Sequence, residues 1–413
     1  MKKISAVLLV LVLVGSVAFA GITGSVDTSF GLNLDNGDYG IVNDTEFEIN
    51  LVLHEDLGEA KGGGDVYAEI AASLTFAFDE DTAGIPPTVE VDFDYAKIVS
   101  GDWSVSILGA VDGPNFASSA IDTYAEDETV SDDDLWEEDD AVDVIRKIGK
   151  IGGGLAVSYM DYQVSLAMPY GDLEADTPTN DNNFKNENYK IFASVLTPDI
   201  ELADGLTVAF GAAGLLNNAG KKVGASAKAA YEQDDLAVTF ATDVQYTEEL
   251  NVEVALGAVY DFVAVDAYYA KDALVGDGTE PVENLLSVKA AATIDAFKVV
   301  VTGKDLVNAQ ALGLSVDWDA TDELTANVNG GYTIASKAYY AGAGVTYKVD
   351  EFTAALKGKY SDNVDASDAK LEMEASIESK ALVDGANLYA KWKSGNLLDS
   401  KIGKFTVGAK IEF

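Results

Sequence analysis

The chain has 413 residues, and its 70 acidic residues against 27 basic ones give a formal net charge of −43. Because carboxylates in this excess repel phosphate, we exclude a nucleic-acid partner. The sequence contains no cysteine, so no disulfide contributes to the stability of the fold.

The first twenty residues are typical of a secretory signal peptide that is removed after export. Lysines at positions 2 and 3 give a basic start, an apolar stretch follows from Ile4 to Val14, and Ala18-Phe19-Ala20 offers small residues at the positions that signal peptidase reads. A membrane anchor is the alternative, but the stretch is short for a spanning helix and ends in the cleavage pattern. We therefore expect residues 1–20 to be the signal and residues 21–413 to form one domain.

From residue 22 onward the dominant pattern is alternation of apolar and polar residues, which is the period of a β-strand. In Val66–Phe76 every even position is apolar, and the last segment, Phe405–Phe413, alternates at odd positions. About 22 such segments follow one another, most of them roughly 9–12 residues long, the length of a tilted strand that crosses a membrane. The pattern predicts an all-β fold: a transmembrane, antiparallel, up-and-down β-barrel of about 22 strands, with a range of roughly 16–22.

The links between the segments alternate in length as well. Short links such as Gln233–Asp234 mostly follow even-numbered segments, whereas long links such as 112–143 follow odd-numbered ones. An outer-membrane barrel has this alternation of short turns and long external loops. Two stretches, 54–64 and 197–204, are long where a short turn is expected. Residues 141–150 are the place where we expect a short helix.

Three features favour a barrel in a membrane over a soluble β-sandwich. The apolar positions of many segments run on almost without a charge, as a lipid-facing side requires, since a charge at the middle of the bilayer costs roughly 2–4 kcal/mol. Glycine and alanine are abundant and large aliphatic residues are sparse, which suits a barrel whose interior holds water. Tyrosines recur near segment ends, where aromatic girdles lie in such barrels: Tyr170, Tyr189, Tyr231, Tyr246, Tyr260, Tyr332, Tyr347 and Tyr360.

The signal peptide, the alternating strands and a final strand that ends in Phe413 resemble bacterial outer-membrane porins. The resemblance covers nearly the whole chain after the signal, and it is one of pattern rather than of a specific motif. It implies a location in the outer membrane of a diderm bacterium, contact with its lipid, and insertion by the barrel-assembly machinery, which reads a C-terminal aromatic such as Phe413. It further implies a water-filled pore for passive diffusion of small hydrophilic solutes or cations, in a barrel that can form a homotrimer.

On this resemblance, the polar positions of the strands are candidates for the wall of the pore. An acidic set near the N-terminus comprises Asp27, Glu46, Glu48, Glu69, Glu90, Asp92 and Asp94. A mixed, partly basic set near the C-terminus comprises Lys357, Lys359, Lys391, Lys393, Lys404 and Lys410, with Glu372, Glu374 and Glu412 among them. Closure brings the last strand beside the first, so the two sets either create a field across the pore or simply keep the lumen hydrated. Because rings of Asp and Glu favour cations, we expect cation preference.

The most unusual stretch of the chain is the acidic segment 122–143, which contains no basic residue. It is either a solvated external loop, a loop that folds inward and narrows the pore, or a weak binder of Ca²⁺ or Mg²⁺, which prefer carboxylate oxygens. Its spacing does not match an EF-hand, so it defines no metal site, and we expect no cofactor. The residues concerned are Glu126, Asp127, Glu128, Asp132, Asp133, Asp134, Glu137, Glu138, Asp139 and Asp140.

The sequence offers little for catalysis, and we do not expect an enzyme. The chain has one histidine, His54, which we interpret as an interfacial or loop residue, and it has no G-x-S-x-G nucleophile motif. Residues 214–222 resemble a phosphate loop only faintly, because the spacing of their glycines is wrong. Two other functions stay open beside a pore: a surface adhesin or structural barrel without a conducting lumen, and a soluble exported β-protein such as a surface-layer component.

Overall fold

The computed structural model describes residues 18–59, 64–79, 88–111, 113–118, 151–167, 190–217, 220–246, 250–275, 280–363, 369–383 and 385–412. These residues contain 23 strands in one sheet and one short 3-10 helix, η2 (Leu397–Asp399). The strands are β1 (Ala18–Asn33), β2 (Tyr39–Glu59), β3 (Asp65–Asp79), β4 (Thr88–Ser100), β5 (Trp103–Val111), β6 (Ile151–Tyr159), β7 (Tyr162–Ala167), β8 (Lys190–Leu196), β9 (Ile200–Ala203), β10 (Leu206–Asn217), β11 (Gly220–Gln233), β12 (Leu236–Tyr246), β13 (Leu250–Tyr260), β14 (Val263–Val275), β15 (Glu280–Ile294), β16 (Phe297–Lys304), β17 (Ala311–Asp319), β18 (Leu324–Thr333), β19 (Ala338–Val349), β20 (Phe352–Asn363), β21 (Lys370–Val383), β22 (Ala386–Lys393) and β23 (Lys404–Glu412).

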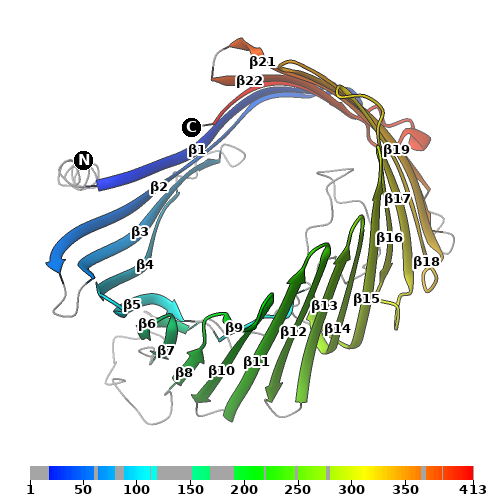
Figure 1. Ribbon diagram of the computed structural model, residues 1–413. Coiled ribbons are helices and arrows are strands. Elements are labelled where there is room, and N and C mark those ends of the chain that lie inside the picture. Colours follow the sequence, from blue (N-terminus) through cyan, green and yellow to red (C-terminus); the bar gives the residue numbers. More distant parts are fainter. Residues whose placement is uncertain are drawn as a thin grey trace, which may run out of the picture.

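The strands curve round a central space and form a closed wall (Figure 1). Consecutive strands pair antiparallel, except that β8 and β9 do not pair with each other, and β23 pairs with β1 from Ser25↔Glu412 to Asn33↔Lys404. β8 and β9 both pair with β10, so they are one strand that is interrupted at residues 197–199. With β8 and β9 counted as one, the 23 strands form a ring of 22 barrel strands, which confirms the predicted all-β, up-and-down antiparallel barrel.

The two stretches that departed from the alternation of link lengths are largely strand, so reading them as long links was wrong. β2 continues to Glu59, which absorbs much of 54–64, and β9 occupies half of 197–204. Their alternation is obscured in the sequence, because acidic residues crowd the first stretch and the interruption breaks the second. The proposed helix at 141–150 lies outside the described residues.

The short turns at one end of the barrel use aspartate in the left-handed backbone region. The φ angles of these residues lie between 50° and 66°, a region that most side chains avoid and that Asp tolerates. The turn residues concerned are Asp161, Asp234, Asp261, Asp295 and Asp350. The repeated Asp at segment ends is thus a turn signal that sets the register of the strands it joins.

The two faces of the wall differ in chemistry. In β5, Trp103, Val105 and Ile107 are exposed, the last by 58% of its surface, whereas Ser104 and Ser106 between them are half-buried. The same alternation recurs in β17, where Leu312 and Leu314 are exposed, and along most other strands. Because a water-soluble surface rarely exposes so many large apolar side chains together, this face is the outer, lipid-facing one.

Aromatic pairs mark the level of the short turns on the outer face. The rings of Trp103 and Tyr159 lie 4.5 Å apart between centroids, and those of Phe297 and Trp318 are stacked at 5.9 Å. Each of these residues lies at or next to the end of its strand, where an interfacial girdle belongs. Within the described part of the chain, no helix is long and apolar enough to cross a membrane.

Candidate functional site

The inner face of β20–β22 carries rows of alternating charge. Lys357 is opposite Glu374, which is opposite Lys393, and Lys359 is opposite Glu372. The Nζ of Lys391 lies 3.2 Å from Oε2 of Glu374, whose side chain is buried. Lysines and glutamates therefore share this part of the wall, and the acids offset much of its basic charge.

The seam between the last and first strands continues this charged wall. The hydroxyl of Tyr389 on β22 donates to Oδ1 of Asp27 on β1 at 2.7 Å, across the intervening strand β23. The hydrogen bond passes over Gly408, where a Cβ atom would lie 2.5 Å from the tyrosine ring. Lys410 is opposite Asp27 in the register of β23 and β1. Barrel closure thus brings a predicted acidic residue beside a predicted basic one.

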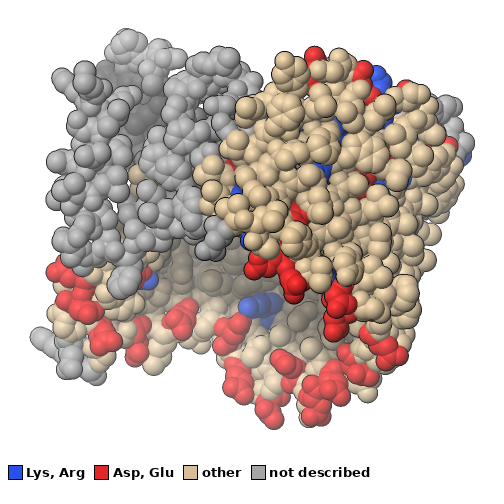
Figure 2. All heavy atoms as spheres, turned by 90° about the horizontal axis from the view of Figure 1, so that it is seen from above, with Lys and Arg blue, Asp and Glu red and all other residues tan. Residues whose placement is uncertain are grey.

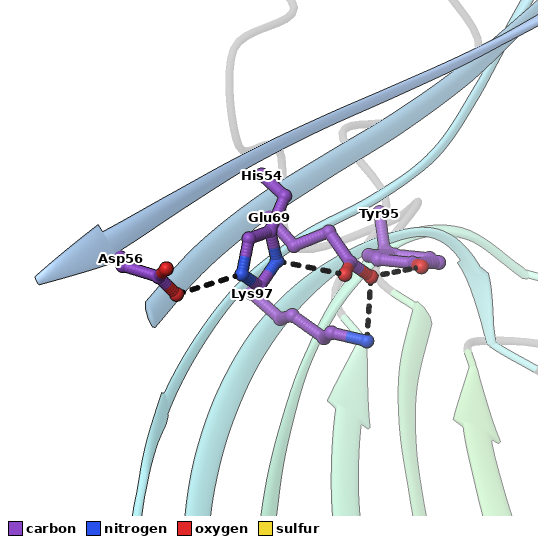
Figure 3. Close-up of polar contacts among 5 residues, drawn as sticks. All are labelled: His54, Asp56, Glu69, Tyr95 and Lys97. Atoms are coloured by element: carbon purple, nitrogen blue, oxygen red, sulfur yellow. Dashed lines mark hydrogen bonds and ion pairs between the residues drawn. The ribbon is translucent and has the colours of Figure 1, made fainter. Parts of the chain in front are cut away.

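A second polar group, the β2–β4 cluster, consists of His54 and Asp56 from β2, Glu69 from β3, and Tyr95 and Lys97 from β4 (Figure 3). Glu69 is its centre. Its Oε1 lies 2.7 Å from Nζ of Lys97 and accepts a hydrogen bond from the hydroxyl of Tyr95 at 2.5 Å. His54 is the fourth member of the network, with one ring nitrogen facing each of the two carboxylates.

Of this cluster, the sequence identified Glu69 alone. Tyr95 and Lys97 were missed because of a β-bulge in β4: Tyr95 is opposite Ala71 and Phe93 is opposite Ala72, so Asp94 is an extra, unpaired residue with an exposed side chain. A bulge shifts the alternation by one residue. As a result Tyr95 and Lys97 face Glu69, although the pattern before the bulge assigns odd positions to the apolar side. His54 and Asp56 were missed because 54–64 was read as a link, whereas β2 continues to Glu59.

The other predicted pore-lining residues divide into two groups. For the acids on β2 and β4 the structure describes only the strand register, in which Glu46 is opposite Ser25, Glu48 is opposite Thr23, Glu90 is opposite Thr75 and Asp92 is opposite Ser73. Lys404, in contrast, lies over Gly31 of β1, where a Cβ atom would come within 2.9 Å of its Cε. The acidic residues of 126–140 and Phe413 lie outside the described residues.

The segment 113–118, which follows β5, binds the inner wall through a set of contacts that we name the latch. The carboxylate of Asp243 on β12 accepts the backbone N–H of Phe116 at 3.0 Å and that of Ala117 at 2.5 Å. Ser226 on β11 donates to the carbonyl oxygen of Pro114 at 2.8 Å. Asp243 and Ser226 belong to the polar face of their strands, so the segment lies inside the barrel.

The latch also depends on shape. Pro114 packs on Gly211 of β10 so closely that a Cβ atom at this glycine would lie 2.4 Å from the proline ring. Lys228 of β11 lies over the ring of Phe116, with Nζ 5.4 Å from the centroid, and it is 2.8 Å from Oδ1 of Asp199. Asp199 is part of the interruption between β8 and β9, which thereby contributes to holding the segment.

Burial shows that the lumen is filled unevenly. Several inward-facing residues of β7, β8, β10, β14 and β15 are almost fully buried, namely Ser165, Phe192, Ala213, Tyr268 and Ser287. Of the described residues in β17–β20, none is buried to this degree. The open side of the lumen therefore includes β17–β20. Among the described residues, no group of three or more His, Asp or Glu is placed to hold a metal ion.

A closed wall with an apolar outer face and a charged inner face defines a membrane-spanning β-barrel with a polar lumen. No family model matches the sequence, and no curated protein matches it. Among solved structures, a multiple mutant and a triple mutant of the porin of Rhodopseudomonas blastica are 11% and 12% identical to the chain, with TM-scores of 0.36 and 0.34. Each match covers 96% of this chain and 100% of the porin.

A third structure, described as "Asymmetric conductivity of engineered proteins", is 12% identical over 95% of this chain and 100% of its own, with a TM-score of 0.36. The first two are porins, the class that the strand pattern resembles.

Proposed function

We propose that the protein is a porin of the outer membrane, with a water-filled lumen through which small hydrophilic solutes diffuse passively. The observation that carries the proposal is the charged wall from β20 through the seam to β4. Lys391, Glu374, Asp27 and Glu69 all lie on the polar face of this wall, which keeps that side of the lumen hydrated. A barrel that serves only as a scaffold has no need of such a wall.

We further propose that the pore prefers cations. Exposed acids occur at each short turn that the structure describes in full, at Asp102, Asp161, Asp204, Asp234, Asp261, Asp295, Asp322 and Asp350. In Figure 2 acidic side chains gather along the lower rim of the visible face, with few basic ones among them. A ring of carboxylates at a pore mouth concentrates cations, and the lysines of β20–β23 moderate the effect.

The latch gives the pore a narrowing element. It holds the segment 113–118 against β10–β12, and buried inward-facing residues such as Phe192 and Ala213 lie on the neighbouring strands β8 and β10. We propose that the conducting path runs along the opposite, open side. In this view the latch decides how much of the cross-section is available to solutes.

Recordings on protein refolded from detergent into planar bilayers test the proposal. Discrete steps of current and a reversal potential that indicates cation preference in a KCl gradient are expected. Asp243→Asn should raise the conductance, because an amide has one acceptor oxygen where the carboxylate uses two. Asp266→Asn is the matched control, since it removes an inward-facing charge from the next strand but one and leaves the latch in place.

Two results would count against this function. Anion preference at neutral pH would refute the selectivity, and stable insertion without any current steps would favour the adhesin or structural barrel. The buried inward-facing side chains, such as Phe192 and Tyr268, are the observation that favours this second candidate. Solubility of the protein without detergent would refute the membrane barrel altogether.

A further inference from the structure

We propose that His54 is a proton-controlled selector in the lumen: its protonation links Asp56 to Glu69 and removes the net negative charge of the β2–β4 cluster. The proposal rests on the proposed function, because a selector requires a conducting lumen. It concerns a residue that the sequence pattern gave no role.

The ring of His54 lies between two carboxylates. Its Nε2 is 3.0 Å from Oδ1 of Asp56, and its Nδ1 is 3.5 Å from Oε2 of Glu69. A neutral imidazole carries one N–H group and can donate to one of these acids, whereas the protonated ring donates to both. Protonation therefore completes a bridge that the neutral ring can form only in part.

The two acids differ in how firmly they are held. Glu69 is fixed by Lys97 and Tyr95, and only 16% of its side-chain surface is exposed. Asp56 is 84% exposed, and its side chain contacts His54. The ring of Tyr67 packs on the imidazole at 4.6 Å between centroids and keeps it in place. Protonation of His54 should thus immobilise Asp56 and leave Glu69 where it is.

The charges around the ring can be counted strand by strand. β2 contributes Asp56, β3 contributes Glu69 and the hydroxyl of Tyr67, and β4 contributes Lys97 and the hydroxyl of Tyr95. With a neutral ring the cluster has two negative charges against one positive, and with a protonated ring the charges balance. The selectivity of a pore depends on the charges that line it, so protonation should weaken cation preference.

Protons can reach the ring of His54, and few other groups in the chain change their protonation state between pH 5 and pH 8. Of the side-chain surface of His54, 40% is exposed. Histidine changes charge between pH 5 and pH 8, and the chain has one. Besides histidine, only an α-amino terminus ordinarily titrates within this pH range.

The experiment compares reversal potentials in a KCl gradient at pH 8 and pH 5.5 for the wild type, His54→Gln and Asp102→Asn, the last removing a rim acid outside the cluster. The cation-to-anion permeability ratio of the wild type and of Asp102→Asn should fall by about two-fold on acidification. That of His54→Gln should stay constant. A conducting wild type with a constant ratio, or an equal fall in His54→Gln, would overturn the selector.

A second measurement does not depend on current. In ¹⁵N-histidine NMR of the refolded barrel in detergent, Asp56→Asn should change the titration midpoint of His54, and Asp102→Asn should leave it unchanged. Equal midpoints in all three proteins would refute the pairing with Asp56. Absence of current at both pH values would refute the proposed function and the selector with it, whatever the NMR titration shows.

Discussion

Asp35 binds Gly403 across the seam of the barrel, although the two residues are separated by almost the whole chain. The carboxylate of Asp35, in the link between β1 and β2, accepts the N–H of Ile402 at 2.5 Å and that of Gly403 at 3.1 Å. The backbone N–H of Leu34 donates to the carbonyl oxygen of Gly403 at 2.7 Å. The two links thus clamp the first and last strands at the end opposite the short turns.

The clamp should contribute to stability. Asp35→Ala removes two hydrogen bonds to a charged acceptor, and because the carboxylate is exposed we expect a loss of about 1 kcal/mol. The temperature at which the folded, fast-migrating band converts to the unfolded one in a detergent gel measures the effect. Asp322→Ala, which removes an exposed acid from a short turn, is the control. Equal conversion temperatures for the two variants would show that the clamp does not stabilise the seam.

Two glycines of β10 should respond differently to the same change. Gly211→Ala places a methyl group 2.4 Å from Pro114, so the segment 113–118 must move, and we expect a larger and noisier single-channel conductance. In Gly214→Ala the nearest atom lies 3.9 Å from the new Cβ, which is ordinary contact, so the conductance should not change. If the two variants conduct alike, the latch does not limit the pore.

The ion pair of Lys391 and Glu374 should show strong coupling. Lys391→Gln leaves a carboxylate that is 7% exposed without its ammonium partner, and we expect a loss of about 2 kcal/mol, less than for a fully buried pair because the lysine is partly solvated. The double variant with Glu374→Gln should recover part of this loss. Thermal unfolding of the single and double variants completes the cycle, and additive losses would contradict the coupling.

The short turns should tolerate only residues that accept the left-handed region. At Asp295, where φ is 51°, substitution by Gly should be nearly neutral. Asp295→Val should cost about 1–2 kcal/mol, because a β-branched side chain is strained there. Refolding yield and conversion temperature in detergent gels report the difference. A valine variant as stable as the glycine variant would contradict the assignment of Asp295 as a turn residue.

The fold could be predicted from the sequence because its rules are local. The period of two gives the strands, and the aspartates at 234, 261 and 295 give the turns that join them. The predicted number of about 22 strands was right because each barrel strand has its own alternating segment. The errors at 54–64 and 197–204 arose where a long strand end and an interruption looked like loops.

The site was less predictable, because it depends on contacts between distant parts of the chain. Asp243 and Phe116 are 127 residues apart, and nothing in either segment indicates that they meet. Part of the β2–β4 cluster was missed for local reasons instead: the bulge at Asp94 reverses the alternation, so Lys97 could not be assigned to the inner face, and His54 and Asp56 lie in 54–64, which was read as a link. The charged sets followed from the alternation, but which lysine lies opposite which glutamate in the ladders of β20–β22 required the register.

The pairing of β1 with β23 has a consequence for biogenesis. The second edge of the first strand pairs with residues 404–412, which are synthesised after all the other strands described. Until those residues arrive, every shorter nascent chain has two unpaired edges that can add foreign strands. A deletion that removes β23 should therefore yield aggregation-prone chains rather than a smaller barrel.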